Sequence, residues 1–285
     1  MMEDSFTRYL AAKQSVDDRS LNEGVWQSLL AHLPPEPLAI LEVGAGTGAM
    51  LDRLDARGFL PRVAEYTAID ADPTNVAEAQ RRLSGRPWPI EVELAAADVY
   101  EFARRERGRR TWDLLIAHAF LDLVDIPRLL PDLFALLRPG GMFYFTINFD
   151  GLTALEPRVD PDLDERVIEL YHQTMDERRV DGRPAGGRRA GRALLTLIPA
   201  AGGEIIAAGA SDWIVMPWQG HYPADEAYFM HYILGFFEES LRERPELEPR
   251  RFASWLGRRH GQIDAGELVL IAHQLDMCGR VGGDA

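Results

Sequence analysis

Residues 40–50 read Ile40-Leu41-Glu42-Val43-Gly44-Ala45-Gly46-Thr47-Gly48-Ala49-Met50, and this stretch decides the fold of the 285-residue chain. An apolar run ends at Val43, glycines occupy positions 44, 46 and 48, and apolar residues then recur at helical spacing. The pattern predicts a strand, a tight turn and a helix. Glycines allow positive φ and close approach of a ligand, and a helix N-terminus offers free N–H groups. The turn therefore predicts a binding site for a polar or anionic ligand.

Apolar strands and amphipathic helices alternate through the first half of the chain, with short connections between them. This alternation predicts an α/β fold with a doubly wound, mostly parallel sheet and right-handed crossovers. In such a sheet the ligand lies outside the carboxyl ends of the strands. The predicted strands span residues 38–43, 63–69, 90–94, 112–117 and 142–148.

The flanking segments are mainly helical. Residues 5–33 predict two helices joined at residues 17–20, and the proline-rich residues 34–37 separate this N-terminal helical lid segment, 1–37, from the main domain, 38–285. Because no flexible linker follows residue 150, we interpret segments 151–192 and 217–263 as helical cap insertions. The pattern predicts helices at 162–179, 193–201, 224–242 and 249–262, and strands at 204–216 and 267–276.

Composition limits the classes of partner. The chain has 31 Lys plus Arg against 45 Asp plus Glu, a formal charge of −14 and a sequence pI near 5.0. Nucleic acid is therefore not expected as a partner, because its phosphates are bound mainly by clustered cations. The single cysteine, Cys278, excludes an internal disulfide and a cysteine-based zinc site, and we predict no metal.

Targeting features are also missing from the sequence. Residues 1–18 carry charges throughout, which excludes a signal-peptide core. No apolar run approaches the roughly 20 residues that a membrane-spanning helix needs. These features predict a cytoplasmic protein with no membrane partner, and the scarcity of lysine indicates a GC-rich bacterial genome.

The glycine turn alone leaves two cofactors open. Gly44, Gly46 and Ala49 also satisfy the dinucleotide pattern, with Asp70 at about the distance expected for a ribose-binding acid, so an NAD(P)-dependent oxidoreductase is one alternative. Glu42 argues against a nicotinamide cofactor, because a nicotinamide site usually keeps apolar packing at the end of this strand. A further acid after the third strand and a Pro-Gly-Gly turn before the fifth also favour another cofactor.

In this combination the chain resembles the class I S-adenosylmethionine-dependent methyltransferases over roughly residues 38–150. That resemblance implies a seven-stranded Rossmann-like sheet with an antiparallel last strand, to which the predicted helices add a lid. Segments 204–216 and 267–276 resemble the sixth and seventh strands of the family, separated here by a helical insertion. The matching motifs are Glu42-x-Gly44-x-Gly46-x-Gly48, Ala68-Ile69-Asp70, Ala97-Asp98, Trp112-Asp113-Leu114-Leu115 and Leu137-Arg138-Pro139-Gly140-Gly141.

The resemblance implies which residues hold S-adenosylmethionine. The backbone of the glycine turn would hold the methionine part together with Glu42, Asp70 the ribose and Asp98 with Val99 the adenine. Asp72 competes with Asp70 as the ribose ligand, and Asp70 and Asp98 could instead cap the helices that follow them. Arg19 or Lys13 of the lid could meet the carboxylate of the cofactor, or both could be surface charges. The predicted cofactor-binding residues are Glu42, Gly44, Ala45, Gly46, Gly48, Asp70, Ala71, Asp98, Val99, Arg19 and Ala117.

Methyl transfer mainly requires that the acceptor be placed close to the methyl group with water excluded. A general base is needed only if the acceptor must first lose a proton. His118, directly after the fourth strand, is the first candidate for that base and His221 the second, although either could be a loop histidine bonded to backbone. The Asn-Pro-Pro-Tyr signature of enzymes that methylate base amino groups is absent from this loop.

Aromatic residues gather between positions 213 and 237. Trp218 and Tyr222 lie in a predicted loop and are candidates, with Asp122, for binding the methyl acceptor. Tyr228, Tyr232 and Phe236 are four residues apart, which is typical of a helix stripe that faces a core. The basic cluster from Arg178 to Arg192 is either a solvated loop or a site for an acidic group on the substrate.

We therefore predict a methyltransferase that uses S-adenosylmethionine, yields S-adenosylhomocysteine and acts on a small molecule. A protein that senses S-adenosylmethionine without catalysis is the alternative from another class. The acceptor, the methylated atom, the need for a base and the oligomeric state stay open, with a homodimer as one alternative.

Overall fold

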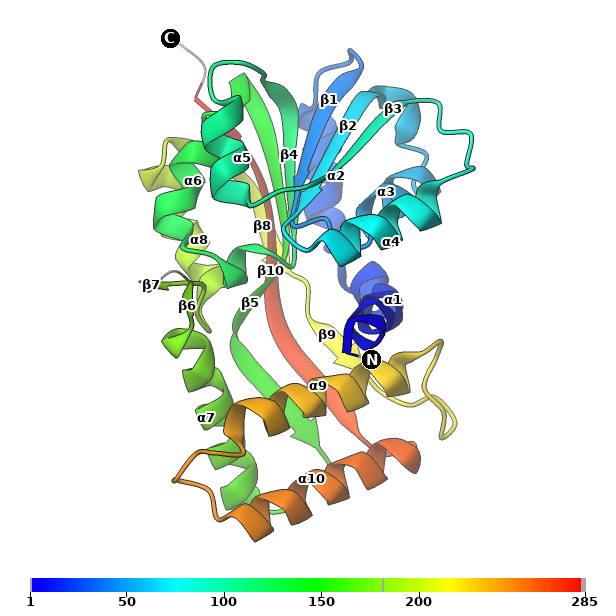
Figure 1. Cartoon of the computed structure of the whole chain (residues 1–285), viewed down its shortest axis with the longest axis vertical. Helices are drawn as coiled ribbons and strands as arrows, with labels where there is room; N and C mark the ends of the chain where they lie inside the picture. The colour runs from blue at the N-terminus through cyan, green and yellow to red at the C-terminus, as the bar shows by residue number, and fades with distance from the viewer. Residues whose placement is uncertain (1, 181, 283–285) are drawn as a thin grey trace.

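The computed structural model describes residues 2–180 and 182–282, with side chains from residue 6 onward. Its centre is an eight-stranded sheet in the order β3-β2-β1-β4-β5-β10-β8, with β9 paired to β10 (Figure 1). Strands β1 to β5 are parallel, and β10 runs antiparallel to both of its neighbours. The strands are β1 (Leu38–Val43), β2 (Val63–Asp70), β3 (Glu91–Ala96), β4 (Trp112–His118), β5 (Leu137–Glu156), β8 (Gly203–Ala210), β9 (Trp213–Val215) and β10 (Val269–Val281).

Helices cover both faces of this sheet and its lower end (Figure 1). One face packs against α5, α6 and α8 and the other mainly against α2 and α3, while α1, α7, α9 and α10 surround the lower part. The short hairpin β6 (Arg179–Val180) and β7 (Arg183–Pro184) follows α7. The helices are α1 (Met2–Ser20), α2 (Glu23–His32), α3 (Ala49–Ala56), α4 (Pro73–Leu83), α5 (Val99–Glu106), α6 (Ile126–Phe134), α7 (Pro161–Glu177), α8 (Ala190–Ala200), α9 (Glu226–Leu241) and α10 (Pro249–Asp264), with single 3-10 turns at η1 (Leu60–Arg62) and η2 (Leu121–Leu123).

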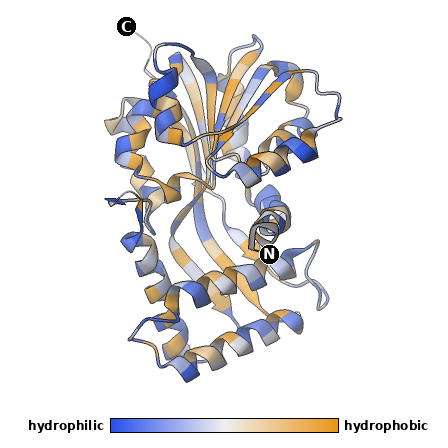
Figure 2. Cartoon of the chain, in the orientation of Figure 1, coloured by the Kyte–Doolittle hydropathy of each residue, from blue (hydrophilic) through white to orange (hydrophobic). Residues whose placement is uncertain are grey.

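The central strands are apolar because both of their faces are covered. In β4, Leu115 and Ala117 face the α5, α6 and α8 side, whereas Leu114 and Ile116 face the α2 and α3 side. The period of two residues thus supplies two cores from one continuous apolar run. Helices such as α4 and α10 instead mix hydrophilic and hydrophobic residues (Figure 2), as expected for elements with one face in solvent.

Strands β5 and β10 continue well below the other strands as an antiparallel ribbon (Figure 1). Register shifts interrupt the pairing of the two strands next to Gln274 and Met277 of β10. On the facing part of β5, Ile147 has a left-handed φ of 55°. Asp276 holds this distortion, since it accepts hydrogen bonds from the Ile147 N–H at 2.7 Å and the Asn22 N–H at 2.8 Å. Burial raises the pKa of Asp276 to about 6. The bend directs the ribbon away from the Rossmann-like part and toward the helices below.

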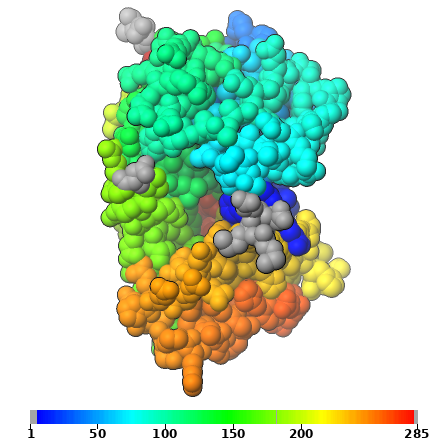
Figure 3. Space-filling view, viewed as in Figure 1, coloured from blue at the N-terminus to red at the C-terminus, as the bar shows by residue number. Residues whose placement is uncertain are grey.

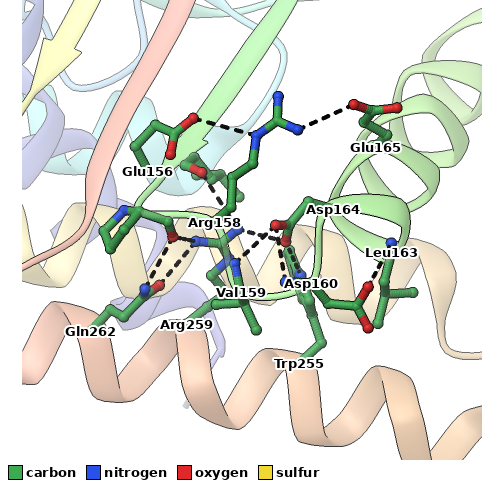
Figure 4. Close-up of polar contacts among 12 residues, drawn as sticks. Glu156, Arg158, Val159, Asp160, Leu163, Asp164, Glu165, Trp255, Arg259 and Gln262 are labelled. Carbon is green, nitrogen blue, oxygen red and sulfur yellow. Dashed lines mark hydrogen bonds and ion pairs between the residues drawn. The ribbon is translucent and has the colours of Figure 1, made fainter.

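The lower helices and this ribbon share a separate apolar core. A buried polar network ties α7 to α10 beneath it (Figure 4). The Arg259 guanidinium is fully buried and donates to Asp164 at 2.6 Å and to the Pro157 carbonyl at 2.8 Å, while Gln262 accepts from it at 2.9 Å. Trp255 donates to the same Asp164 carboxylate at 2.5 Å. These hydrogen bonds fix α10 against the start of α7, while the Nε atom of Arg259 is buried without a partner among the described residues.

The structure confirms the α/β class and the mostly parallel Rossmann-like sheet. Three local predictions were wrong. The fifth strand continues past residue 148 to Glu156, because residues 153–156 pair with β10. The predicted strand 204–216 is divided into β8 and β9, which add to different parts of β10 and bring the sheet to eight strands. The Arg-rich loop contains the β6–β7 hairpin.

Among the described residues, no helix combines the length and apolar character needed to cross a bilayer.

Candidate functional site

One large cavity, of ≈ 770 Å³, lies between the carboxyl ends of the parallel strands and the lower helices. Figure 3 shows the recess between the atoms of the upper part and those of α9 and α10. Its upper wall contains the glycine turn and the segments that follow β2, β3 and β4. Its lower wall is formed by side chains of α1, α7 and α9 and by the β5–β10 ribbon. The cavity thus lies where a doubly wound sheet places its ligand.

The glycine turn has the backbone conformation that its sequence predicts. Gly44, Gly46 and Gly48 have φ values of 68°, 54° and 80°. A Cβ atom on Gly44 would come within 2.2 Å of the Phe120 ring, so this position needs a glycine for space as well as for φ. The turn is held by hydrogen bonds from the Ala45 N–H to the Ile69 carbonyl at 3.0 Å and from the Gly46 N–H to Asp70 at 2.8 Å.

Acids follow β2 and β3 at the same edge of the sheet. Asp70 also accepts hydrogen bonds from the Asp72 N–H at 2.9 Å and Asn75 at 3.2 Å. Asp72 caps α4 and Asp98 caps α5, each by accepting from backbone N–H groups of the first helical turn. All three acids line the cavity. The helix-cap alternative is therefore correct for Asp98 and wrong for Asp70, because Asp72 is the residue that caps α4. Capping does not remove Asp72 or Asp98 from the cavity wall.

A buried carboxylate, Asp17 of α1, connects the upper and lower walls. Burial opposes its ionisation, but Lys13 and the hydrogen bond from His118 hold its pKa well below the ordinary value. Arg53 of α3 lines the cavity beside it, and the Nη1 atom of this arginine is buried without a hydrogen-bond partner among the described residues. The partners of Asp17 are Lys13 Nζ, His118 Nε2 at 3.0 Å, Arg53 Nη2 at 3.5 Å and Trp213 Nε1 at 3.0 Å.

His118 is held from both sides of its ring. Its Nδ1 atom lies 2.8 Å from the Thr146 hydroxyl and its Nε2 atom 3.0 Å from Asp17. Burial and the nearby Arg53 guanidinium lower the pKa of His118 to about 3, so the ring is neutral at pH 7. Nε2–H then donates to Asp17, and Nδ1 accepts from Thr146. In this arrangement neither ring nitrogen is free to take a proton from a methyl acceptor.

Glu42 lies behind the cavity rather than in its wall. Its side chain is buried between β1 and β2, where the Tyr66 hydroxyl donates to it at 2.5 Å. Burial raises the pKa of Glu42 to about 7, against the opposing effect of the Tyr66 hydrogen bond. The carboxyl group therefore supports the strand next to the glycine turn.

The lower wall is mostly aromatic. Tyr9 of α1 stacks on Tyr232 of α9 with ring centroids 4.6 Å apart and meets Phe236 edge-on at 5.5 Å. Tyr171 of α7 stacks on Phe237 of α9 at 3.9 Å. Three helices that are distant in sequence thus form one aromatic surface. The predicted helix stripe of Tyr228, Tyr232 and Phe236 has this role, and Phe236 also reaches the cavity.

The structure separates the predicted site residues into two groups. Arg19 donates to Glu226 at 2.7 Å and to the Ile214 carbonyl at 3.1 Å, away from the cavity. Trp218 is 72% exposed and forms a backbone bridge with His221, and the Tyr222 hydroxyl donates to the Leu268 carbonyl at 2.8 Å. The cavity lining includes Gly44, Ala45, Gly46, Asp70, Ala71, Asp98, Val99, His118 and Asp122, whereas Glu42, Gly48, Ala117, Arg19, His221, Trp218 and Tyr222 are not part of it.

Sequence reasoning missed several residues of this cavity. Arg53 carried a recognisable signal, because it is a charged residue on the apolar face of α3 between Met50 and Leu54. Asp17 was treated as part of a joint between helices, although it lies inside α1. Tyr171 and Thr174 are ordinary positions of an amphipathic helix, and no local pattern distinguishes them. Among the described residues, no group of three or more His, Cys, Asp or Glu is arranged to hold a metal.

Comparison with known proteins agrees with this geometry. Residues 40–141 match a family model described as a methyltransferase domain. A malonyl-(acyl-carrier protein) O-methyltransferase of Halalkalibacterium halodurans is 30% identical over 112 residues, 39% of this chain and 39% of that protein. A tRNA 5-carboxymethoxyuridine methyltransferase of Escherichia coli K12 is 31% identical over 128 residues, 42% of this chain and 46% of that protein. The chain thus spans less than half the length of these curated relatives.

The fold also matches solved structures. The Bacillus halodurans C-125 protein BH2331 superposes with a TM-score of 0.54 at 12% identity, over 92% of this chain and 100% of that one. This similarity covers the lower helices as well as the sheet. It shows that the whole arrangement follows a known architecture.

Proposed function

We propose that the chain is a class I S-adenosylmethionine-dependent methyltransferase that transfers the methyl group of this cofactor to a small, mostly apolar molecule; the match of residues 40–141 to a methyltransferase domain supports this. The supporting observation is the large cavity, which has strand ends and carboxylates on one side and aromatic side chains on the other. One cavity with both kinds of wall can hold a polar cofactor against an apolar acceptor.

The residues of the upper wall fit the cofactor. Asp70 and Asp98 each place a carboxylate in the wall, where it can accept hydrogen bonds from hydroxyl or amino groups. Lys13 and Arg53 add positive charge beside the glycine turn, and the unpartnered Nη1 of Arg53 suits an anionic group such as a carboxylate. When bound, S-adenosylmethionine supplies a methyl group on a positively charged sulfur.

The lower wall would position the acceptor and exclude water. Aromatic side chains of α1 and α9 surround this part of the cavity, so an apolar acceptor would gain by burial there. We assign His118 to positioning, because its ring holds Asp17 and Thr146 together. If the acceptor must lose a proton, Asp122 is the better recipient, since it lines the cavity and burial raises the pKa of its carboxyl.

The proposal is tested first by cofactor binding. Isothermal titration should show binding of S-adenosylmethionine and S-adenosylhomocysteine and a weaker response, or none, to NAD. Tight NAD binding without a response to either methionine derivative would contradict the proposal.

Transfer is tested with methyl-labelled cofactor and two pools of acceptors, a small-metabolite extract and bulk tRNA. Label in the extract fraction is the expected result. Label found only in tRNA would mean that the acceptor is tRNA, as in the name of the Escherichia coli relative. Cofactor binding without labelled product in either pool would favour a sensor of the cofactor.

A further inference from the structure

One cation of the cavity has no acidic partner. Arg178 directly follows α7 and lines the lower part of the cavity, where it is half-buried. Its Nη1 atom donates to the backbone carbonyl of Asp122 at 3.0 Å, but its guanidinium forms no ion pair within residues 2–180 and 182–282. Lys13 and Arg53, the other cations of the lining, are both paired with Asp17. Arg178 is therefore a cation of the lower part of this cavity that no ion pair with a described carboxylate neutralises, whereas Arg53 lies beside the glycine turn on the cofactor side.

The surroundings of Arg178 are rigid and aromatic. Ala185 donates from its N–H to the Arg178 carbonyl at 3.1 Å, and Gly186 packs so closely on Asp122 that a Cβ there would lie 1.7 Å from the Asp122 carbonyl oxygen. The stacked rings of Tyr171 and Phe237 form the adjacent wall. The backbone thus holds the base of the Arg178 side chain beside a flat apolar surface.

Asp122 is the nearby charged group of opposite sign. Its side chain also lines the cavity, and its backbone rather than its carboxylate receives the Arg178 hydrogen bond. Burial raises the pKa of the Asp122 carboxyl, with Arg178 opposing this shift. No ion pair joins the Asp122 carboxylate to the Arg178 guanidinium, which donates to the backbone carbonyl instead. A partly desolvated guanidinium gains most from an anion that forms direct, charge-assisted hydrogen bonds with it.

We infer that the methyl acceptor is a flat, apolar molecule that carries one anionic group, and that Arg178 binds this group while the aromatic wall holds the apolar part. The inference rests on the proposed function, since it takes the lower part of the cavity as the acceptor side. It also bears on the two interpretations of the Arg-rich segment: Arg188 and Arg192 pair with acids of the protein itself, and Arg178 is the arginine of this segment that lines the cavity.

A pair of fluorescent probes tests this inference without knowledge of the acceptor. The dye 8-anilinonaphthalene-1-sulfonate is a flat aromatic anion, and N-phenyl-1-naphthylamine has the same rings without the sulfonate. Both are titrated into protein saturated with S-adenosylhomocysteine, so that only the acceptor side is open. We expect the native protein to bind the sulfonate dye about tenfold more tightly than the neutral dye at low salt, and the preference to fall as salt rises.

Substitutions at two neighbouring arginines locate the effect. Arg178→Met keeps the apolar stem and should abolish the preference for the sulfonate dye, while Arg178→Lys should retain most of it. Arg179→Met is the matched control, because Arg179 is exposed and does not line the cavity. It should leave the affinities of both dyes unchanged.

Two results would overturn the inference. If Arg178→Met lowers the affinity for both dyes equally, Arg178 only supports the Asp122 loop. A native protein without preference for the sulfonate dye would mean that the acceptor side does not select an anion. Binding of S-adenosylhomocysteine is measured first in each variant, so a failure of the methyltransferase assignment appears there and is distinguished from a failure of the anion site.

Discussion

The two walls of the cavity are built in different ways. The upper wall consists of turns at the carboxyl ends of β1 to β4, and its hydrogen bonds connect neighbouring strands, as between Gly46 and Asp70. The lower wall consists of side chains from α1, α7 and α9, such as the Tyr171 and Phe237 pair, which are far apart in sequence. The upper wall is thus set by local backbone geometry, and the lower wall by packing between distant helices. Substitutions in the two walls should therefore separate cofactor binding from acceptor binding.

Gly44→Ala is expected to have the largest effect on the upper wall. A left-handed φ costs an alanine about 1–2 kcal/mol, and overlap with the Phe120 ring adds about 1–3 kcal/mol. Gly58→Ala is the control, since Gly58 has a similar φ of 66° and no heavy atom within 4 Å of the added Cβ. Denaturant unfolding should show the larger loss in Gly44→Ala, together with loss of S-adenosylhomocysteine binding. Equal losses in both variants would show that the Phe120 contact is unimportant.

Glu42→Gln tests the buried acid behind the upper wall. In the folded protein the Glu42 carboxyl has a pKa of about 7, so it stays protonated up to about that pH. In the unfolded chain the same carboxyl releases its proton near pH 4.5. The folded state therefore binds the extra proton between these values, and the free energy of unfolding should fall by up to about 3 kcal/mol as the pH rises through that window.

The Gln variant should lose this part of the pH dependence and be more stable than the native protein at pH 8. Cofactor affinity should change little, because Glu42 does not line the cavity. Parallel stability curves for the two proteins would contradict the buried, protonated state. A large loss of affinity would restore a direct role for Glu42 in cofactor binding.

Asp70→Ala should affect the cofactor side alone. We expect affinity for S-adenosylmethionine to fall at least about tenfold, because each charged hydrogen bond contributes ~1.5–3 kcal/mol. Asp72→Ala is the control, since it removes the cap of α4, at a cost of about 1 kcal/mol in stability, without removing Asp70. Binding of the neutral dye should not change in either variant. If Asp72→Ala has the larger effect on affinity, the ribose contact belongs to Asp72.

His118→Ala tests the link between the walls and should lower stability by about 1–2 kcal/mol for the lost hydrogen bonds. Turnover should fall because α1 loses one of its attachments through Asp17, while cofactor affinity stays nearly the same. Amide hydrogen exchange should become faster in α1 and remain unchanged in α10, which serves as an internal control. Full activity with unchanged exchange would show that His118 contributes neither to positioning nor to proton transfer.

The same contrast explains what the sequence could predict. Asp70 and the glycines were found because periodicity and turn chemistry place them at a strand end, and the parallel sheet then brings such ends together. Trp218 was predicted to bind the acceptor because it lies in a loop within the aromatic-rich region, yet it is exposed, since no local pattern shows which way a loop faces. Asp17 was missed since its importance depends on contacts with β4, α3 and β9.

The lysine content of the chain gives the Asp17 cluster a practical consequence. Lys13 is the single lysine of the 285 residues, and it is buried. Because the amine is buried and paired with Asp17, acylation there requires that α1 first move away from the cavity. Apart from the N-terminus, an amine-directed reagent should therefore modify one position, and its rate there should report how often α1 leaves the cavity. A cofactor that closes α1 over itself would slow that labelling without any other tag on the protein.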